Sequence, residues 1–129
     1  MKRFTGLFAL VLTLLLSGQA VADDWKKLGE KSVNLSRDYD EIRVNDLKKY
    51  DYLKIKVKDQ GVEFRKVIVV FGNGKRHELP VRKYIAKNGE TMALRLPKGD
   101  RYIRKIILDY KTRGGADKRS RVSVYGKRS

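Results

Sequence analysis

The chain has 129 residues, with 31 lysines and arginines against 15 aspartates and glutamates, one histidine and no cysteine. Without cysteine it forms no disulfide and carries out neither thiol catalysis nor thiolate metal binding. A formal net charge of +16 favours anionic partners and opposes self-association, so we expect a monomer.

The first 22 residues have the three parts of a secretory signal peptide. Two basic residues precede an uncharged run over residues 4–16, and Ala20-Val21-Ala22 follows as a small-x-small site. The apolar run is shorter than the roughly 20 residues that span a bilayer. We expect a signal peptide over 1–22, cleavage after Ala22 and a periplasmic or secreted protein. A leader that stays attached as a membrane anchor is the alternative.

The mature segment, residues 23–129, has the size of one domain. It keeps 29 basic and all 15 acidic residues, a net charge of +14. Outside the cytoplasm such a charge meets lipid headgroups, lipopolysaccharide, acidic polysaccharides or acidic proteins. We do not expect nucleic acid, the first candidate for a basic cytoplasmic protein, to be its partner.

Alternation of apolar and polar residues, the pattern of half-buried strands, recurs along the mature segment. The expected strands lie at residues 33–35, 41–44, 53–58, 62–71, 75–81, 92–96, 101–111 and 121–125. About eight strands with a turn signal every 8–12 residues favour an all-β, antiparallel two-sheet sandwich, of which the jelly roll is one form. A small closed barrel is the alternative.

Three local features refine this prediction. The centre of the strand at 62–71, residues 67–71, is apolar on both sides, which is typical of a central strand. Asn73-Gly74 predicts a hairpin with a type I′ turn, which needs positive φ at two positions. Pro80 has no N–H for a ladder, so the strand at 75–81 should be an edge strand or end there.

Four segments consist of turns and strand centres: Trp25-Lys26-Lys27-Leu28-Gly29, Phe71-Gly72-Asn73-Gly74, Arg101-Tyr102-Ile103-Arg104-Lys105-Ile106 and Val122-Ser123-Val124-Tyr125-Gly126. Together they resemble a family of small exported bacterial proteins known only as a domain of unknown function. The resemblance covers nearly the whole mature segment. It implies a bacterial, periplasmic protein and implies no catalytic residue.

Side chains that could carry catalysis are few. His77 is the only histidine, and beside Glu78 alone it lacks the further ligands that zinc requires. No Gly-x-Ser-x-Gly motif marks a nucleophilic serine. Asp38, Asp40 and Glu41 could contribute to a calcium site, but their spacing matches no EF-hand loop, and a solvated acidic loop is the alternative. We expect no catalytic residue, no cofactor and no metal.

Basic side chains are the strongest functional signal. In the strand at 53–58, Lys54, Lys56 and Lys58 alternate with apolar residues and therefore share one face. Further basic residues lie on other expected strands, and the candidate anion-binding set is Lys54, Lys56, Lys58, Arg65, Arg104, Arg119 and Arg121. A solvated face, whose lysines protect strand edges from aggregation, is the competing interpretation.

Three functions remain open at this point. The first is a non-catalytic binding module for an anionic envelope component, such as a lipid headgroup, lipopolysaccharide or an acidic polysaccharide. The second is a structural or interaction protein that engages another envelope protein through a strand edge. The third and weakest is a hydrolase that uses paired carboxylates, because no pair of acids stands out.

Overall fold

The alternating segments form strands whose apolar sides meet in one core. The computed structural model describes residues 24–34, 39–98, 102–111 and 119–128. Within them lie nine strands: β1 (Lys26–Asn34), β2 (Tyr39–Arg43), β3 (Tyr52–Lys58), β4 (Val62–Phe71), β5 (Arg76–Leu79), β6 (Tyr84–Ile85), β7 (Leu94–Arg95), β8 (Ile103–Lys111) and β9 (Arg119–Lys127). The predicted signal peptide, its cleavage site and Asp38 lie outside these residues. Over the described ranges no helix has the length and hydropathy to cross a membrane.

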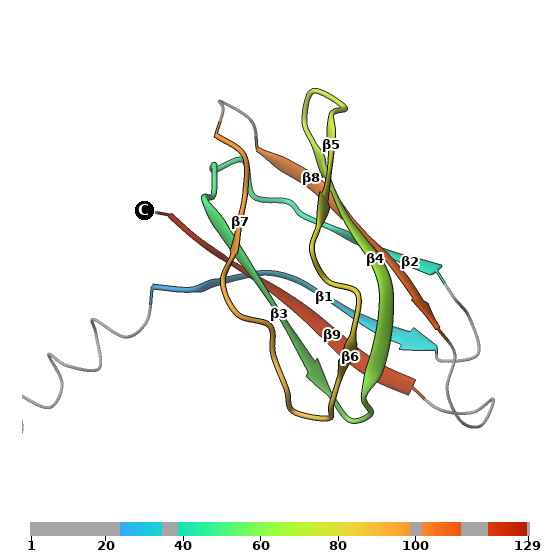
Figure 1. Ribbon diagram of the computed structural model, residues 1–129. Coiled ribbons are helices and arrows are strands. Elements are labelled where there is room, and N and C mark those ends of the chain that lie inside the picture. The colour runs from blue at the N-terminus through green and yellow to red at the C-terminus, as the bar shows by residue number, and fades with distance from the viewer. Residues whose placement is uncertain (1–23, 35–38, 99–101, 112–118, 129) are drawn as a thin grey trace, which may run out of the picture.

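The strands form two antiparallel sheets, seen as two layers in Figure 1. Sheet A has the order β1-β9-β3-β7, and sheet B has the order β2-β8-β4-β5 with β6 also paired to β4. The ladders β1–β9, β2–β8, β3–β7 and β4–β5 are nested, as if one long hairpin were wound around the core. Double-sheet jelly rolls have this arrangement. The predicted sandwich is confirmed, and it takes its jelly-roll form.

The core fills the space between the two sheets. Sheet A contributes every second residue of β3 and β9, and sheet B contributes the corresponding residues of β4 and β8. Fully buried members include Leu53, Ile55, Val57, Phe64, Val67, Val69, Ile106, Leu108, Tyr110, Val122 and Val124. Ile68 is only half-buried, because it alternates with Val67 and Val69 and faces away from the other sheet. The double-sided apolar centre of β4 therefore marks a central strand of sheet B, as predicted.

The hairpin between β4 and β5 differs from the prediction. Within this hairpin only Gly74 has positive φ, at 87°, so the turn is not type I′. The Gly74 N–H donates to the Phe71 carbonyl at 2.9 Å, and the Phe71 N–H donates to the Lys75 carbonyl at 2.9 Å. These bonds define a three-residue loop closed by a left-handed glycine. The Asn73 carboxamide accepts the Lys75 N–H at 3.0 Å, which holds this longer loop.

The edge strands β5 and β7 are shorter than expected, and the hydrogen bonds that their residues can form explain why. β5 is an edge strand of sheet B and ends at Leu79, immediately before Pro80, as predicted. The strand expected at 92–96 is reduced to Leu94–Arg95, and Met92 is exposed. Thr91 takes the inward position instead: its hydroxyl accepts the Ile55 N–H at 3.0 Å, and its own N–H donates to the Ile55 carbonyl at 2.9 Å.

A candidate anion-binding face

The lysines of β3 point outward because the alternate residues of the strand are anchored in the core. Leu53, Ile55 and Val57 are at most 1% exposed. Since successive strand residues point to opposite sides, Lys54, Lys56 and Lys58 lie on the outer side of sheet A. The predicted lysine row is therefore one surface feature of the folded chain.

Strand β9, which pairs with β3 in sheet A, adds a second row of outward side chains beside the lysines. In the β3–β9 ladder, Lys58 is opposite Arg121, Lys56 is opposite Ser123, Lys54 is opposite Tyr125 and Tyr52 is opposite Lys127. Further side chains come from β1, from β7 and from the chain next to β7. We call this outer side of sheet A the basic face, and its members are Trp25, Lys27, Glu30, Tyr52, Lys54, Lys56, Lys58, Glu90, Arg95, Arg121, Ser123, Tyr125 and Lys127.

Aromatic rings alternate with the cations on the basic face. Lys54 Nζ lies 4.6 Å from the centre of the Trp25 ring, and Lys127 Nζ lies 5.8 Å from it. Lys56 Nζ lies 5.3 Å from the Tyr125 ring, and the Arg95 guanidinium lies 5.1 Å from the Tyr52 ring. Each contact has cation–π geometry, with the cation within about 6 Å of a ring centre. Trp25 is half-buried and joins the start of the described chain to β3 and β9.

Two carboxylates partly neutralise the basic face. Glu90 lies 3.3 Å from Lys54 Nζ and 3.7 Å from Lys56 Nζ. Glu30 pairs with Lys27 on its own strand, and its second oxygen is 2.9 Å from Arg121 Nε. The hydrogen bond from Lys27, followed by the nearby positive charges, holds the pKa of Glu30 below its usual value. The face stabilises the Glu30 carboxylate, and its cations outnumber the two acids among the described residues.

A recess lies in the part of the basic face where Lys56 and Lys58 of β3 are opposite Ser123 and Arg121 of β9. It has a volume of about 360 Å³ and is lined by Lys27, Glu30, Lys56, Val57, Lys58, Asn88, Arg121, Ser123 and Tyr125. β1, β9 and β3 supply all of these except Asn88, which comes from the turn between β6 and β7. Cations, neutral hydrogen-bonding groups and an aromatic ring thus meet in one hollow.

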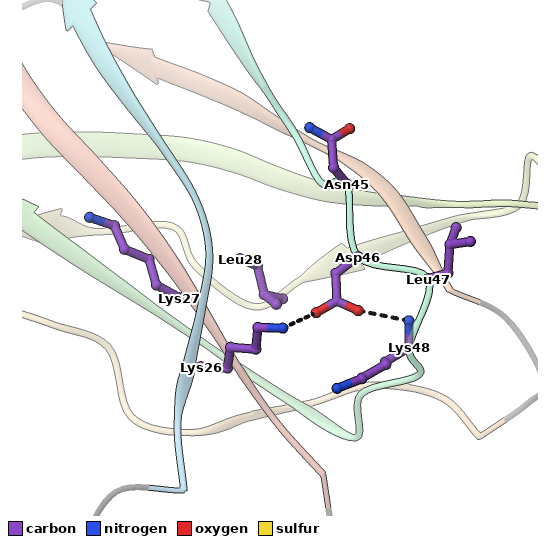
Figure 2. Close-up of a pocket in the computed structure, with 7 residues that line it drawn as sticks. All are labelled: Lys26, Lys27, Leu28, Asn45, Asp46, Leu47 and Lys48. Atoms are coloured by element: carbon purple, nitrogen blue, oxygen red, sulfur yellow. Dashed lines mark hydrogen bonds and ion pairs between the residues drawn. The ribbon is translucent and has the colours of Figure 1, made fainter.

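A second hollow, shown in Figure 2, is occupied by the chain's own polar contacts. Lys26, Lys27 and Leu28 of β1 line it together with residues 45–48, which follow β2. The Asp46 carboxylate accepts hydrogen bonds from Lys26 Nζ at 2.9 Å, from the Lys48 N–H at 2.9 Å and from the Tyr50 hydroxyl at 2.7 Å. These bonds, with that from Tyr50 foremost, hold the pKa of Asp46 far below its usual value. Asp46 is a structural clasp between β1 and the segment before β3.

The sequence places this architecture in a family. The family model described as "Domain of unknown function (DUF2541)" matches residues 7–126. The chain belongs to this family. The resemblance to a domain of unknown function is thereby confirmed over nearly the whole chain.

The structural comparison concerns the fold of the DUF2541 domain. No curated protein sequence matches the chain closely enough to indicate a relative. A solved structure from the work titled "Structural and functional characterization of Pseudomonas aeruginosa AlgX" is similar, with a TM-score of 0.53 and 12% identity over 81% of this chain. The DUF2541 chain spans only 26% of that AlgX chain. At this identity the likeness shows a shared fold.

The candidate anion-binding residues divide between the two sheets. Lys54, Lys56, Lys58 and Arg121 lie together on the basic face, and Arg119 lies at the start of β9 near a smaller recess that Asn34 and Asp40 also line. The other two lie in sheet B. Arg65 of β4 pairs with Asp109 of β8 at 2.6 Å, and Arg104 is an exposed residue of β8.

The acidic cluster does not converge, as far as the described residues show. Asp40 is buried and accepts a hydrogen bond from Tyr110 at 2.9 Å, whereas the next residue, Glu41, lies on the outer side of sheet B and pairs with Lys105 at 3.2 Å. Neighbouring strand residues face opposite sides, so their carboxylates point apart. No group of three or more His, Asp or Glu side chains that could hold a metal occurs in the part of the chain described.

The candidate set from the sequence contained only Lys54, Lys56, Lys58 and Arg121 of the basic face. Lys27, Arg95 and Lys127 join the cations, and Trp25, Tyr52 and Tyr125 supply the rings. Alternation along the last strand does predict that Arg121, Ser123 and Tyr125 share the side opposite Val122 and Val124, and the structure confirms this. The pairing of β9 with both β1 and β3 has no local sequence signal.

Proposed function

We propose that this DUF2541 domain is an exported, non-catalytic binding module that uses the basic face to hold an anionic component of the bacterial envelope. The observation that carries the proposal is the β3–β9 ladder, which aligns Lys54, Lys56 and Lys58 beside Arg121 on one side of sheet A. The mature net charge of +14 would attract such a polymer from a distance, and the basic face would hold it.

The arrangement of the basic face supports a role beyond solubility. Like charges directly opposite each other destabilise an antiparallel ladder, and Lys58 faces Arg121 in that way. A face selected only for solubility would mix charges of both signs along its strands. On the outer side of sheet B, Arg65 pairs with Asp109 and Lys105 pairs with Glu41, whereas Glu30 and Glu90 on the basic face are each shared by two cations.

The edge strands give less support to protein binding by strand addition. β7 has two residues, and β5 ends before Pro80. β2 has five residues, of which Asp40, Glu41 and Arg43 are charged, and β1 has a register shift between Lys27 and Gly29. Short strands, charges, prolines and bulges are the features that discourage edge pairing. The basic face therefore carries the leading proposal.

The proposal is tested by two triple variants of equal charge. One variant replaces Lys54, Lys56 and Lys58 with glutamine. The matched control replaces Lys66, Lys75 and Lys111, which are exposed residues in or beside the strands of sheet B. Binding to heparin and to phosphatidylglycerol vesicles is measured at several salt concentrations, because exposed charges are screened beyond about 10 Å at 0.1 M salt.

Both variants lose the same formal charge, so long-range attraction falls equally and only the local arrangement differs. We expect the β3 variant to lose far more affinity than the control at every salt concentration. Equal losses would mean that the lysine row is a solvated face, and the proposed function would then be wrong.

The proposed export has its own test. Mass spectrometry of the protein isolated from its native envelope should show an N-terminus at Asp23. Retention of Met1 would contradict a cleaved leader and would change the set of polyanions that the basic face can meet.

A further inference from the structure

The recess on the basic face has a small floor surrounded by long side chains. Ser123 of β9 is opposite Lys56 of β3 and opposite Glu30 of β1. Arg121 and Tyr125 lie two residues before and after it on the same outer side of β9. Ser123 is only 8% exposed, because these neighbours rise around it. The recess forms at this position because Ser123 has a short side chain, whereas the residues around it have long ones.

The rim of the recess is held in place by an anchored turn. Asn88 has φ of 63°, in the left-handed region that asparagine tolerates better than most residues. The Gly89 N–H donates to the Ala86 carbonyl at 2.8 Å, and the Gly89 carbonyl accepts the Val57 N–H at 2.9 Å. The turn is therefore fixed to β3, and Asn88 borders the recess opposite β1.

The lining of the recess mixes charge with neutral hydrogen bonding. Four cations surround it, and the hydroxyl of Ser123, the amide of Asn88 and the ring of Tyr125 complete it. Cations alone would suffice for a bare phosphate group or for a flat lipid surface. A hydroxyl, an amide and an aromatic ring suit a ligand that has hydroxyl groups and an apolar ring face as well as a negative charge. A volume of about 360 Å³ lies within the size range of small-ligand sites.

The recess already stabilises one carboxylate, that of Glu30. It lies between Lys27 and Arg121, with Lys58 close enough to contribute to its electrostatic stabilisation. An acidic group that enters from solvent would meet the same two cations and would compete with Glu30 for them. The chemistry that recognises a ligand carboxylate is thus present within the chain.

We propose that this recess, floored by Ser123, is the subsite for one acidic sugar unit of an anionic polysaccharide. The inference depends on the proposed function and specifies its ligand class. The negative group of the sugar replaces Glu30 between Lys27 and Arg121, and the sugar ring lies beside Tyr125. Sugar hydroxyls hydrogen-bond to Ser123 and Asn88. Trp25 and Tyr52 lie further along the same face, where neighbouring units of the polymer can follow.

The first test fills the recess without changing the charge. Ser123→Val places a larger, strand-compatible side chain on the floor, and Ser32→Val makes the same substitution on β1 outside the recess lining. Binding of trigalacturonate and of a heparin-derived tetrasaccharide is measured by calorimetry, with maltotriose as the uncharged probe. Polyphosphate and phosphatidylglycerol vesicles are the polyanions without sugar rings. Equal thermal midpoints for the two variants establish that both are folded.

We expect Ser123→Val to weaken binding of at least one acidic oligosaccharide by about tenfold or more, and Ser32→Val to change it by less than about twofold. Polyphosphate and vesicle binding should be the same for both variants, and maltotriose should bind much more weakly. Equal oligosaccharide affinity of the two variants would overturn the subsite. Binding of vesicles but of neither acidic oligosaccharide by the wild-type protein would overturn the sugar assignment in favour of a membrane surface.

A second test removes the internal competitor. Glu30→Gln and Glu90→Gln each delete one negative charge from the basic face, but only Glu30 lines the recess. Glu30→Gln should raise the affinity for the bound acidic oligosaccharide several-fold more than Glu90→Gln does. Equal effects would show that only net charge matters and would overturn the subsite. If the β3 lysine variant loses heparin binding while the recess variants do not differ from their controls, the proposed function remains supported and the recess is not the subsite.

Discussion

Lys58 of β3 and Arg121 of β9 are direct register partners in one antiparallel ladder, with both side chains on the outer side of sheet A. Two positive charges in this position repel each other, and the ion pair between Glu30 and Arg121 at 2.9 Å offsets part of that repulsion. The chain therefore keeps a locally unfavourable pair at one end of the β3–β9 ladder. Binding of an anion between the two residues would relieve the repulsion.

This relationship predicts opposite effects on stability and binding. Lys58→Thr should raise the free energy of unfolding by about 0.2–1 kcal/mol, the size of a cross-strand pair term, while it lowers affinity for heparin. Urea unfolding and calorimetry measure the two quantities. Lys66→Thr is the control, because Lys66 is opposite Asp109 and its loss should not stabilise the chain. A destabilised Lys58→Thr variant would show that the Lys58–Arg121 contact is not repulsive.

The Asp46 clasp predicts acid-sensitive stability. Ionised Asp46 has a folded-state pKa far below the unfolded value of about 3.9, so its contribution is complete above about pH 5 and is lost as the pH falls through the folded pKa. Asp46→Asn should reduce the free energy of unfolding by about 1–3 kcal/mol at pH 7. The difference from wild type should shrink toward pH 2 in urea titrations. A difference that is constant with pH would refute this linkage.

Tyr50 predicts a loss of stability in alkali. Burial, together with the hydrogen bond to Asp46, raises the pKa of Tyr50 to about 12, above the unfolded value of about 10. A raised folded pKa contributes stability that is present below pH 10 and lost as the pH rises toward 12. Wild type should therefore lose more stability than Tyr50→Phe over this interval. Parallel curves for the two proteins would speak against the assignment.

The buried hydrogen bond of the Tyr110 hydroxyl predicts how much stability is lost when that hydroxyl is removed. Tyr110 is fully buried, and its hydroxyl lies 2.9 Å from Asp40 Oδ2 and 3.1 Å from the Asn34 carbonyl. Tyr110→Phe should lower the free energy of unfolding by about 1–3 kcal/mol, because the buried Asp40 loses a donor. Tyr52→Phe, which removes an exposed hydroxyl bonded to Arg95, should change it by less than about 0.5 kcal/mol. Similar costs for both variants in urea unfolding would contradict this reasoning.

Two glycines predict destabilisation by different causes. Gly74 has φ of 87°, and no atom lies within 4 Å of the position that a Cβ would occupy, so Gly74→Ala should cost about 1–2 kcal/mol from backbone strain alone. A Cβ at Gly126 would lie 2.7 Å from Leu28 and 2.8 Å from the Tyr50 ring, so Gly126→Ala should cost about 1–3 kcal/mol from overpacking. Gly74→Asn, which tolerates positive φ, should recover much of the loss at 74. Failure of that rescue in urea unfolding would argue against strain as the cause.

Local residue patterns predicted most of the strands, but they missed β6 and all but the last two residues of β1. The alternation in residues 53–58 placed three lysines on one side of β3, because side chains of a strand alternate whatever the strand pairs with. Pro80 likewise marked the end of β5, since a missing N–H is a property of the residue itself. The type I′ prediction at Asn73-Gly74 failed because the same two residues also suit a three-residue loop, and the Asn73–Lys75 hydrogen bond favours that loop.

The pairing of strands that are far apart in the sequence determines which outward side chains lie together on one sheet. β9 ends the chain yet lies between β1 and β3, and this pairing brings Arg121, Ser123 and Tyr125 beside the lysine row while Arg65 and Arg104 go to the other sheet. Strand partners far apart in the sequence are selected by the shared core and by the summed ladder hydrogen bonds, and neither leaves a local signature. Residue patterns alone therefore account for most of the strands, the outward lysines and the excess of positive charge. The winding of the jelly roll places Ser123 among long neighbours, so the recess is a product of the fold.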